Sequence, residues 1–238
     1  MRNLDHSHWW FLGMTAIIDG VLRRYYRGKT DLEILDAGCG TCWLTFSLER
    51  YGRVTALDIE PETLRICRER GIQKTVEADI QNISLPDKSF DLIVCSEVLY
   101  HKYVMSDRLV MRVFHRLLRP GGRVLVKVPA HAYLSGAHDE VNLTRERYEI
   151  EGVMALFSET GYVIDFLSFA NFFLLPLVYL KRKTETMFKT KPASDIQKTA
   201  KPLNFLLTMI LRFEGMLLSR IRLPGGSSII AVGRKLGE

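Results

Sequence analysis

The stretch ILDAGCGTCW, residues 34–43, decides the fold of this chain. It predicts an aliphatic β-strand that runs into a turn containing Gly38 and Gly40, after which a helix begins. Glycines in such a turn let the backbone approach a bound molecule closely. A second strand, at 54–60, carries Asp58, where a carboxylate can accept hydrogen bonds from both hydroxyls of a ribose. The stretch therefore predicts a nucleoside site at one edge of a sheet.

Outward from this stretch, strand-like and helix-like segments alternate along the chain. Strands are expected at 32–36, 54–60, 75–79, 90–99, 123–129, 162–169 and 227–235, and helices at 9–27, 44–52, 61–71, 107–122 and 144–161. Alternation of this kind requires crossover connections and produces a mostly parallel sheet with helices on both faces. We therefore predict an α/β fold with a doubly wound, seven-stranded, mostly parallel sheet.

Three parts are expected along the chain. Residues 1–29 form an N-terminal helix that serves as a lid, residues 30–171 together with 224–238 form the α/β core, and residues 172–223 form a helical insertion. The insertion is inferred because a direct connection to the last strand needs only a few residues.

The insertion is expected to contain an amphipathic helix. Its apolar face comprises Leu203, Leu206, Leu207, Ile210, Leu217, Leu218 and Ile221. A bilayer-spanning helix is not expected, because Pro176 interrupts one apolar run and Arg212 and Glu214 interrupt the other. Three roles remain open for the apolar face: packing on the domain, docking to a membrane or lipid-linked acceptor, and pairing with a second copy.

Composition and charge narrow the class of protein. Hydrophobic residues make up 47% and charged residues 25%, which excludes a disordered, collagen-like or coiled-coil chain. Four cysteines are too few for a disulfide-stapled secreted scaffold, and the N-terminus lacks the order of a signal peptide, so we expect a reducing cytosol.

The positive charge is concentrated in the last part of the chain. Residues 181–238 hold 12 basic and four acidic residues, a net +8; because the whole chain carries +6, the first 180 residues carry −2. The basic residues alternate with aliphatic runs, a pattern that favours an anionic membrane surface over nucleic acid as the partner of this part.

Several segments resemble class I S-adenosylmethionine-dependent methyltransferases. They are ILDAGCGTC, ALDIEP, EADIQNISLPDKSFDLIVCSEVLYH and LRPGGRVLVKVP, and together they cover roughly residues 30–170 plus the closing strand. The resemblance implies a Rossmann-like fold, S-adenosylmethionine as cofactor and methyl transfer as activity. HWWFLG and VPAHAYLSGAHDEVNLTRERYEIEGVMALFSETGY further resemble a bacterial subgroup associated with surface-polysaccharide or lipid-linked glycan pathways.

The resemblance implies which residues bind the methionine part of the cofactor. Asp36 would anchor the ammonium group, directly or through water, and the backbone of Gly38, Cys39 and Gly40 would line the methionine. Cys42 stands where the family has its third glycine. The resulting C-x-x-C sequence is interpreted as variation of the cofactor turn, and no metal site is predicted.

The adenosine part would be bound by residues that follow the next two strands. By the same resemblance, Asp58 would hold the ribose hydroxyls and Ile59 would pack on the adenine ring. Asp79 would accept a hydrogen bond from the adenine amino group, with Ile80 beside it.

Residues near the transferable methyl group come from the fourth strand and the loops beyond it. The resemblance places Cys95 and Ser96 near the sulfonium. A hydroxyl acceptor would need a base, and histidine suits that role near neutral pH. His101 and His138 are the candidates, the latter as an acid–base pair oriented by Asp139.

Two further groups of residues have open interpretations. Arg145 and Arg147, on the predicted helix 144–161, either face solvent or pair with a phosphate or carboxylate of the acceptor. Trp9 and Trp10 either pack as a lid or contact cofactor or acceptor.

These observations predict a methyltransferase that acts on a small-molecule acceptor, at an oxygen of a sugar or lipid-linked glycan. A quinone-like or polyketide-like acceptor and a non-catalytic binding module with this fold are the alternatives. A cytoplasmic location is expected. Peripheral association at the inner membrane face through residues 172–223 and formation of a homodimer are both left open. Nucleic acid is not expected as a partner.

Overall fold

The computed structural model describes residues 7–188 and 199–237. Residues 1–6 of the predicted lid and 189–198 of the predicted insertion lie outside the described residues.

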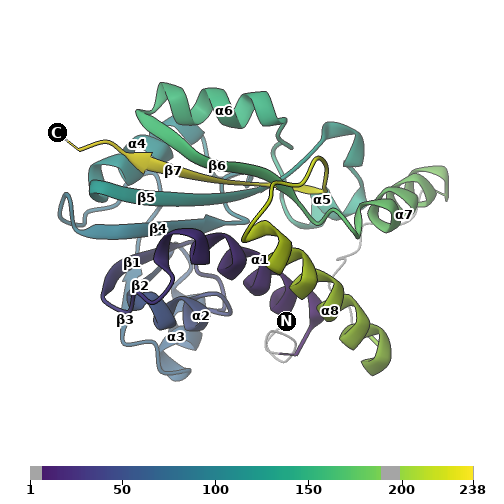
Figure 1. The fold of residues 1–238 in the computed structure, drawn as a ribbon, viewed down its shortest axis with the longest axis horizontal. Coiled ribbons are helices and arrows are strands. Elements are labelled where there is room, and N and C mark those ends of the chain that lie inside the picture. The colour runs from purple at the N-terminus through teal and green to yellow at the C-terminus, as the bar shows by residue number, and fades with distance from the viewer. Residues whose placement is uncertain (1–6, 189–198, 238) are drawn as a thin grey trace.

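A single seven-stranded sheet forms the centre of the molecule (Figure 1). The strands are β1 (Leu32–Ala37), β2 (Gly52–Asp58), β3 (Lys74–Glu77), β4 (Phe90–Ser96), β5 (Leu118–Pro129), β6 (Tyr162–Ala170) and β7 (Ser228–Lys235), in the spatial order β3-β2-β1-β4-β5-β7-β6. β7 runs antiparallel to both of its neighbours, and the pairs from β3 to β5 are parallel. The predicted fold class is confirmed.

Helices cover both faces of the sheet. They are α1 (Trp9–Tyr26), α2 (Thr45–Leu48), α3 (Pro61–Glu69), α4 (Asp107–Leu117), α5 (Ala137–Val141), α6 (Ile150–Glu159), α7 (Leu175–Phe188) and α8 (Lys201–Leu218), with short 3₁₀ helices at Glu49–Tyr51 and Ala132–Leu134. Buried side chains of α4 and α6 form one core layer with one face of the sheet, and those of α1 and α8 form another with the opposite face. Aliphatic side chains on both faces of β1 are therefore buried, as expected for a central parallel strand.

Two predicted helices are shorter than expected. The helix at 107–122 ends at Leu117, and the chain continues directly as β5 through Pro120. The residue before a proline is biased towards extended backbone, which explains the early end. The helix at 144–161 begins only at Ile150, because the backbone N–H groups of Arg145 and Tyr148 donate to the carbonyls of Tyr100, after β4, and Pro129, at the end of β5, instead of forming a helix.

Helices α1 and α8 lie side by side and approach each other closely (Figure 1). A Cβ atom at Gly20 would lie 2.0 Å from the carbonyl oxygen of Gly215, and one at Gly215 would lie 2.3 Å from that of Ala16. Glycine is thus required where the two backbones touch. The predicted N-terminal lid and the predicted insertion form one packed layer, while the division of the chain into three domains stays a prediction.

The amphipathic helix of the insertion exists, and its buried face was predicted in part: Leu218 is buried, and Leu207 and Ile210 pack against the core. The buried residues of α8 are Thr208, Leu211, Glu214, Gly215 and Leu218, and of the predicted face Leu203, Leu206 and Ile221 are about half exposed. The close contact at Gly215 turns this side of α8 inward. Glu214 is tolerated there because its carboxylate accepts hydrogen bonds from the N–H groups of Asn171 and Phe173. None of the described helices combines the length and the apolar character needed to cross a bilayer.

Candidate functional site

A cavity of about 640 Å³ opens at the carboxyl ends of the central parallel strands. One side of it is formed by the turn after β1, where Gly38, Gly40 and Trp43 line the cavity. Ligands of open α/β sheets bind at this edge, because the loops that follow the strands gather there. Trp43 lines the cavity and Cys42 is buried behind it, so neither residue fills the space.

Gly38 and Gly40 have left-handed backbone conformations, with φ of +81° and +52°. At Gly38 a Cβ would collide with Val98, whereas at Gly40 no atom lies within 4 Å of the Cβ position. The turn therefore leaves open space beside an exposed stretch of backbone. Such a cradle fits a ligand that lies against the main chain.

Asp36 ends up beneath the turn instead of on the cavity wall. It is 2% exposed, and the Thr45 hydroxyl donates to Asp36 Oδ2 at 2.6 Å. Burial raises the pKa of Asp36 to about 7; the Thr45 hydrogen bond lowers it, and the charge of Asp58 adds to the rise. A cation placed above this carboxyl group would favour its ionised form, which fits the predicted role towards an ammonium group.

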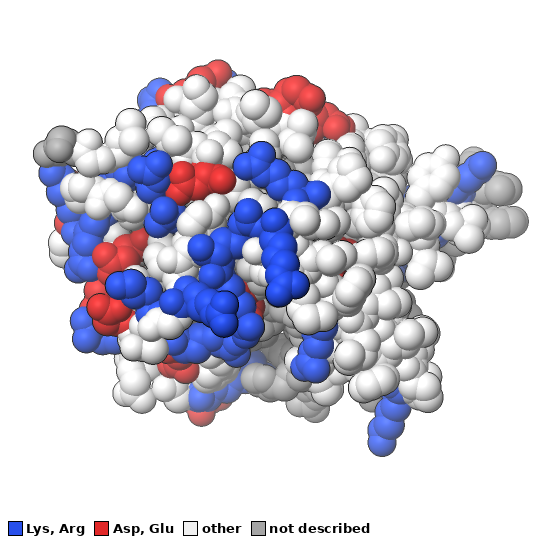
Figure 2. All heavy atoms as spheres, viewed as in Figure 1, with Lys and Arg blue, Asp and Glu red and all other residues white. Residues whose placement is uncertain are grey.

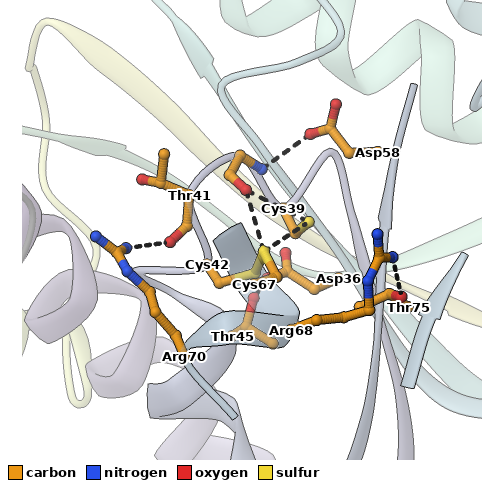
Figure 3. The surroundings of a disulfide bond; sticks show 11 residues. Asp36, Cys39, Thr41, Cys42, Thr45, Asp58, Cys67, Arg68, Arg70 and Thr75 are labelled. Carbon is orange, nitrogen blue, oxygen red and sulfur yellow. Dashed lines mark hydrogen bonds between the residues drawn. A yellow bond between two sulfur atoms is a disulfide. The ribbon is translucent and has the colours of Figure 1, made fainter. Parts of the chain in front are cut away.

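Asp58 joins the two halves of the predicted nucleoside site (Figure 3). Its Oδ2 accepts a hydrogen bond from Gly40 N at 2.9 Å, and its Oδ1 accepts one from Glu60 N at 3.0 Å. The next residue, Ile59, is 59% exposed, so its side chain is accessible to a ligand. Neither Asp58 nor Ile59 lines the cavity, and their roles towards adenosine stay predictions.

Asp79 lies two residues beyond the end of β3, and its carboxylate accepts hydrogen bonds from the backbone and side chain of Gln81. Ile80 is buried in the core. The predicted adenine contact of Asp79 remains a prediction, since no described atom tests it.

The end of β4 brings polar groups to the cavity. Ser96 lines it, and Ser96 Oγ is buried with no hydrogen-bond partner among the described residues, so it awaits a ligand atom. Cys95 is fully buried and does not line the cavity. Glu97, which follows, has φ of +63°, a conformation that side-chain-bearing residues rarely adopt and that often marks functional sites.

Glu97 and Lys127 were not predicted from the sequence. Lys127 lies in β5 with no exposed surface, and its ammonium group pairs with the Glu97 carboxylate and donates to the Ser228 hydroxyl at 3.2 Å. The signal was available: a lysine inside the aliphatic strand VLVKVP must find an anionic partner when it is buried.

Both predicted histidines line the cavity, but the predicted acid–base pair is wrong. Asp139 does not orient His138: its carboxylate accepts two hydrogen bonds from Arg147, at 2.7 and 2.9 Å. His138 Nε2 instead lies 2.5 Å from the Asn142 side-chain amide. Burial lowers the pKa of His101, which favours a neutral ring that can accept a proton.

The two arginines do not lie on a helix, because α6 begins after them. Arg147 lines the cavity and is bound by Asp139. Arg145 is held by Asp107 and Glu146 and does not line the cavity, so it braces the loop. The interpretation that both arginines face solvent on a helix is therefore wrong.

The opposite side of the cavity is mostly apolar. Trp9 and Trp10 of α1, Leu177 and Val178 of α7, and Leu207 of α8 form what we call the apolar wall. The tryptophans therefore contribute to the cavity itself. Their contribution was one of the two interpretations left open by the sequence.

A disulfide joins Cys42 in the turn to Cys67 in α3 (Figure 3). From the sequence, Cys39 and Cys42 were interpreted as variation of the cofactor turn, and a reducing cytosol was expected. That interpretation missed this pairing, because residues 25 positions apart in the chain are brought together only by the packing of α3.

Comparison with known proteins agrees with this geometry. Residues 35–126 match the family described as a methyltransferase domain. A ubiquinone biosynthesis O-methyltransferase of Xanthomonas oryzae pv. oryzae is 35% identical over 112 residues, which are 43% of this chain and 46% of the relative. This chain thus matches less than half the length of that relative.

Solved structures share the fold. One is an S-adenosylmethionine-dependent methyltransferase from Mesorhizobium loti. The match covers 92% of this chain and 98% of that chain, with 19% sequence identity and a TM-score of 0.60. Another is phosphoethanolamine N-methyltransferase 2 of Haemonchus contortus, solved in complex with S-adenosyl-L-methionine. The match covers 91% of this chain and 51% of that chain, with 18% sequence identity and a TM-score of 0.59. The comparisons thus match residues 35–126 to a methyltransferase domain and show that the fold is shared with solved methyltransferases. The narrower resemblance to a glycan-associated subgroup stays a prediction.

Proposed function

We propose that this chain transfers a methyl group from S-adenosylmethionine to a small-molecule acceptor bound in the cavity. The observation that carries the proposal is the open glycine turn at Gly38 and Gly40, flanked by Asp36 and Asp58, within the segment that matches the methyltransferase domain. S-adenosylmethionine supplies an electrophilic methyl group on a positively charged sulfur.

The residues of the chain mainly bind and align. Asp58 has oxygen atoms at the strand edge to accept hydroxyl donors, and Asp36 places a carboxyl group beneath the turn for a cation. Ser96 Oγ offers a buried hydrogen-bonding group at the cavity. Alignment of an acceptor with a reactive group can contribute about 7–11 kcal/mol to lowering a barrier.

Isothermal titration with S-adenosylmethionine tests the cofactor assignment. We expect saturable binding to one site per chain. A folded protein that shows no heat of binding would refute the assignment, and the non-catalytic alternative would be favoured if binding occurs without turnover of any acceptor.

The acceptor is proposed to be amphipathic and to react through oxygen. The apolar wall favours a molecule with an aliphatic or aromatic part, while Glu97, Arg147 and the two histidines offer polar contacts at the other side of the cavity. The resemblance to an O-methyltransferase of ubiquinone biosynthesis supports a phenolic, quinone-like acceptor. The glycan acceptor predicted from the sequence shares this amphipathic character only if it is lipid-linked.

Mass spectrometry separates the two acceptor classes. The protein is incubated with isotopically labelled S-adenosylmethionine and either polyprenylated catechols or polyprenyl-linked sugars, and the labelled methyl group is sought in each product. Label in the catechol alone supports the quinone-like acceptor, whereas label in the sugar alone supports the glycan.

His101 is proposed as the base that takes the proton of the acceptor hydroxyl. It lines the cavity, and burial lowers its pKa, so a neutral ring is available near pH 7. The Asn142 amide beside His138 Nε2 makes that ring less available. We expect His101→Gln to lower kcat about 100-fold with little change in cofactor affinity, whereas His115→Gln, on α4 outside the cavity, should retain activity.

The outer face of α7 and α8 is proposed to dock on an anionic membrane. Side chains that are about half exposed or more include Leu177 and Leu180 on α7 and Leu203, Phe205, Leu206, Met209, Phe213 and Met216 on α8. Soluble surfaces rarely expose so many large apolar groups together. Because Leu177 also lines the cavity, this face is continuous with the apolar wall.

The charges around this face favour anionic lipid. The exposed basic residues there are Lys181, Lys183, Lys201, Arg212 and Arg220. The acidic residue of α8, Glu214, is turned inward and buried. Figure 2 shows the lower right of the molecule, over α8, as mainly uncharged, with Lys and Arg as its visible charged residues. Basic groups beside an apolar helix face bind anionic interfaces.

Vesicle flotation tests this surface. The protein should float with vesicles containing phosphatidylglycerol and should not float with pure phosphatidylcholine. The double variant Phe205→Ser/Leu206→Ser should lose flotation, and Met105→Ser, which changes an even more exposed apolar residue elsewhere, should keep it. Absence of flotation combined with a doubled mass in light scattering would replace the membrane with a second copy of the chain.

A further inference from the structure

Three of the four cysteines gather in a small buried cluster behind the glycine turn. Cys42 of the turn is bonded to Cys67 in the last turn of α3, and Sγ of Cys39 lies 3.9 Å from Sγ of Cys67. Figure 3 shows this bridge beside the hydrogen bond between Gly40 and Asp58. The residue that replaces the third glycine of the family pattern is therefore the one that attaches the turn to α3.

The two halves of the turn are held in different ways. In the first half, the N–H groups of Gly38 and Cys39 donate to Leu57 O at 2.7 and 2.9 Å. The second half is held to α3 and the residue after it by the disulfide and by Arg70, whose guanidinium donates to Thr41 O at 2.6 Å. The disulfide is thus the covalent restraint on the second half, beside hydrogen bonds such as that from Cys42 N to Cys39 O at 3.0 Å.

The backbone at Cys42 needs such a restraint. Its φ of +65° lies in the left-handed region, which a residue with a side chain rarely adopts unless its surroundings hold it there. Two unbonded sulfur atoms also require more room than a bonded pair, as the 3.9 Å between Cys39 and Cys67 illustrates. Reduction of the bridge in this packed cluster would therefore move the turn.

The third thiol does not compete for the bridge. Burial raises the pKa of the Cys39 thiol, with the negative charges of Asp36 and Asp58 adding to the rise. Thiol–disulfide exchange requires a thiolate, so a protonated Cys39 leaves the pair Cys42–Cys67 intact.

We propose that the pair Cys42–Cys67 is a redox-controlled site that sets the affinity of the turn for S-adenosylmethionine. This inference rests on the proposed function. A dithiol gives two electrons and two protons to the bridge and becomes a disulfide itself, while Cys42 and Cys67 become thiols. The oxidised turn is organised before binding, whereas the reduced turn must be ordered at binding, which weakens the affinity.

The experiment compares the two redox forms of the unmodified chain. Under denaturing conditions N-ethylmaleimide should label only Cys39 and Cys95 in the oxidised form, and all four cysteines after dithiothreitol. Titration calorimetry with S-adenosylmethionine should then give a dissociation constant about tenfold higher for the reduced form, equivalent to about 1.4 kcal/mol.

A variant separates the bridge from unrelated effects of the reductant. Cys67→Ser should bind S-adenosylmethionine as the reduced protein does, with the same affinity in the presence and absence of dithiothreitol. Cys67 lies in α3 behind the turn and does not line the cavity, so this change removes the bridge without replacing a side chain of the cavity wall.

Three results would overturn the inference. Equal affinities of the oxidised and reduced forms would remove redox control while leaving the methyltransferase assignment intact. Four labelled cysteines without reductant, together with stoichiometric zinc in elemental analysis, would make the cluster a metal site instead. Failure of both redox forms to bind the cofactor would refute the proposed function itself.

Discussion

Two regions of the cavity are built in opposite ways: the cofactor edge and the apolar wall across from it. The cofactor edge consists of the turn 38–43 together with Asp36 and Asp58. The edge comes from short stretches that directly follow strands, and its groups are held by hydrogen bonds within a few residues of those strands. The apolar wall takes residues from both ends of the chain, brought together by the contact of α1 with α8. Binding of a shared cofactor is thus encoded locally, while the shape offered to the acceptor depends on long-range packing.

We expect the largest loss of cofactor affinity when the acid that joins the two halves of the edge, Asp58, is removed. Asp58→Ala loses the acceptor of Gly40 N and the predicted ribose contacts, so binding of S-adenosylmethionine should weaken by about 1.5–3 kcal/mol, as for hydrogen bonds to a charged group. Titration calorimetry measures the change. Glu77→Ala is the matched control, because Glu77 is the exposed register partner of Asp58 on β3. Equal losses in both variants would show that the edge is not organised around Asp58.

A change of one methyl group at the α1–α8 contact tests the other region. Gly215→Ala places a Cβ 2.3 Å from the Ala16 carbonyl oxygen and should lower the free energy of unfolding by about 1–3 kcal/mol. Gly152→Ala, also within a helix but with no atom within 4 Å of its Cβ position, should raise it by about 0.4–1 kcal/mol. Urea denaturation monitors both variants, and a stable Gly215→Ala protein would mean that the two helices are not in such close contact.

The smallest expected effect is the pH dependence of the edge. Deprotonation of Asp36 as pH rises through about 7 creates the carboxylate that attracts a cation, so affinity for S-adenosylmethionine should rise by up to about tenfold per pH unit below 7 and level off above it. Calorimetry at several pH values measures this rise. Asp36→Asn should flatten it, and an unaltered profile in that variant would assign the proton to another group.

Stability without cofactor should follow the opposite trend. The folded pKa of Asp36 lies above its ordinary value of 3.8, so the folded protein keeps a proton that the unfolded chain releases. The contribution of this group to the free energy of unfolding is therefore fully present below about pH 4 and is lost as pH rises towards 7. Thermal unfolding of the wild type and of Asp36→Asn separates this contribution from those of other groups.

Local pattern was sufficient for the strands and the edge but misleading for the loops. The strands around ILDAGCGTCW were predicted because aliphatic runs alternate with turn residues, and the mostly parallel sheet followed from the crossover connections, whereas the spatial order of the strands came from the structure. Residues 144–149 resembled a helix in composition, yet the N–H groups of Arg145 and Tyr148 donate to a carbonyl in the loop after β4 and to one at the end of β5. A backbone donor takes whichever carbonyl the tertiary structure supplies, and no helical periodicity reveals that choice.

The sequence by itself determined the α/β fold, the glycine turn and the acids at the carboxyl ends of the first strands. These features depend on residues near one another in the chain, where backbone preference and strand polarity act directly. Only the tertiary structure decided which face of α8 is buried, that Arg147 binds Asp139, and that Cys42 meets Cys67. Those outcomes depend on how closely distant segments can approach, as the backbone contact between Gly215 and α1 illustrates.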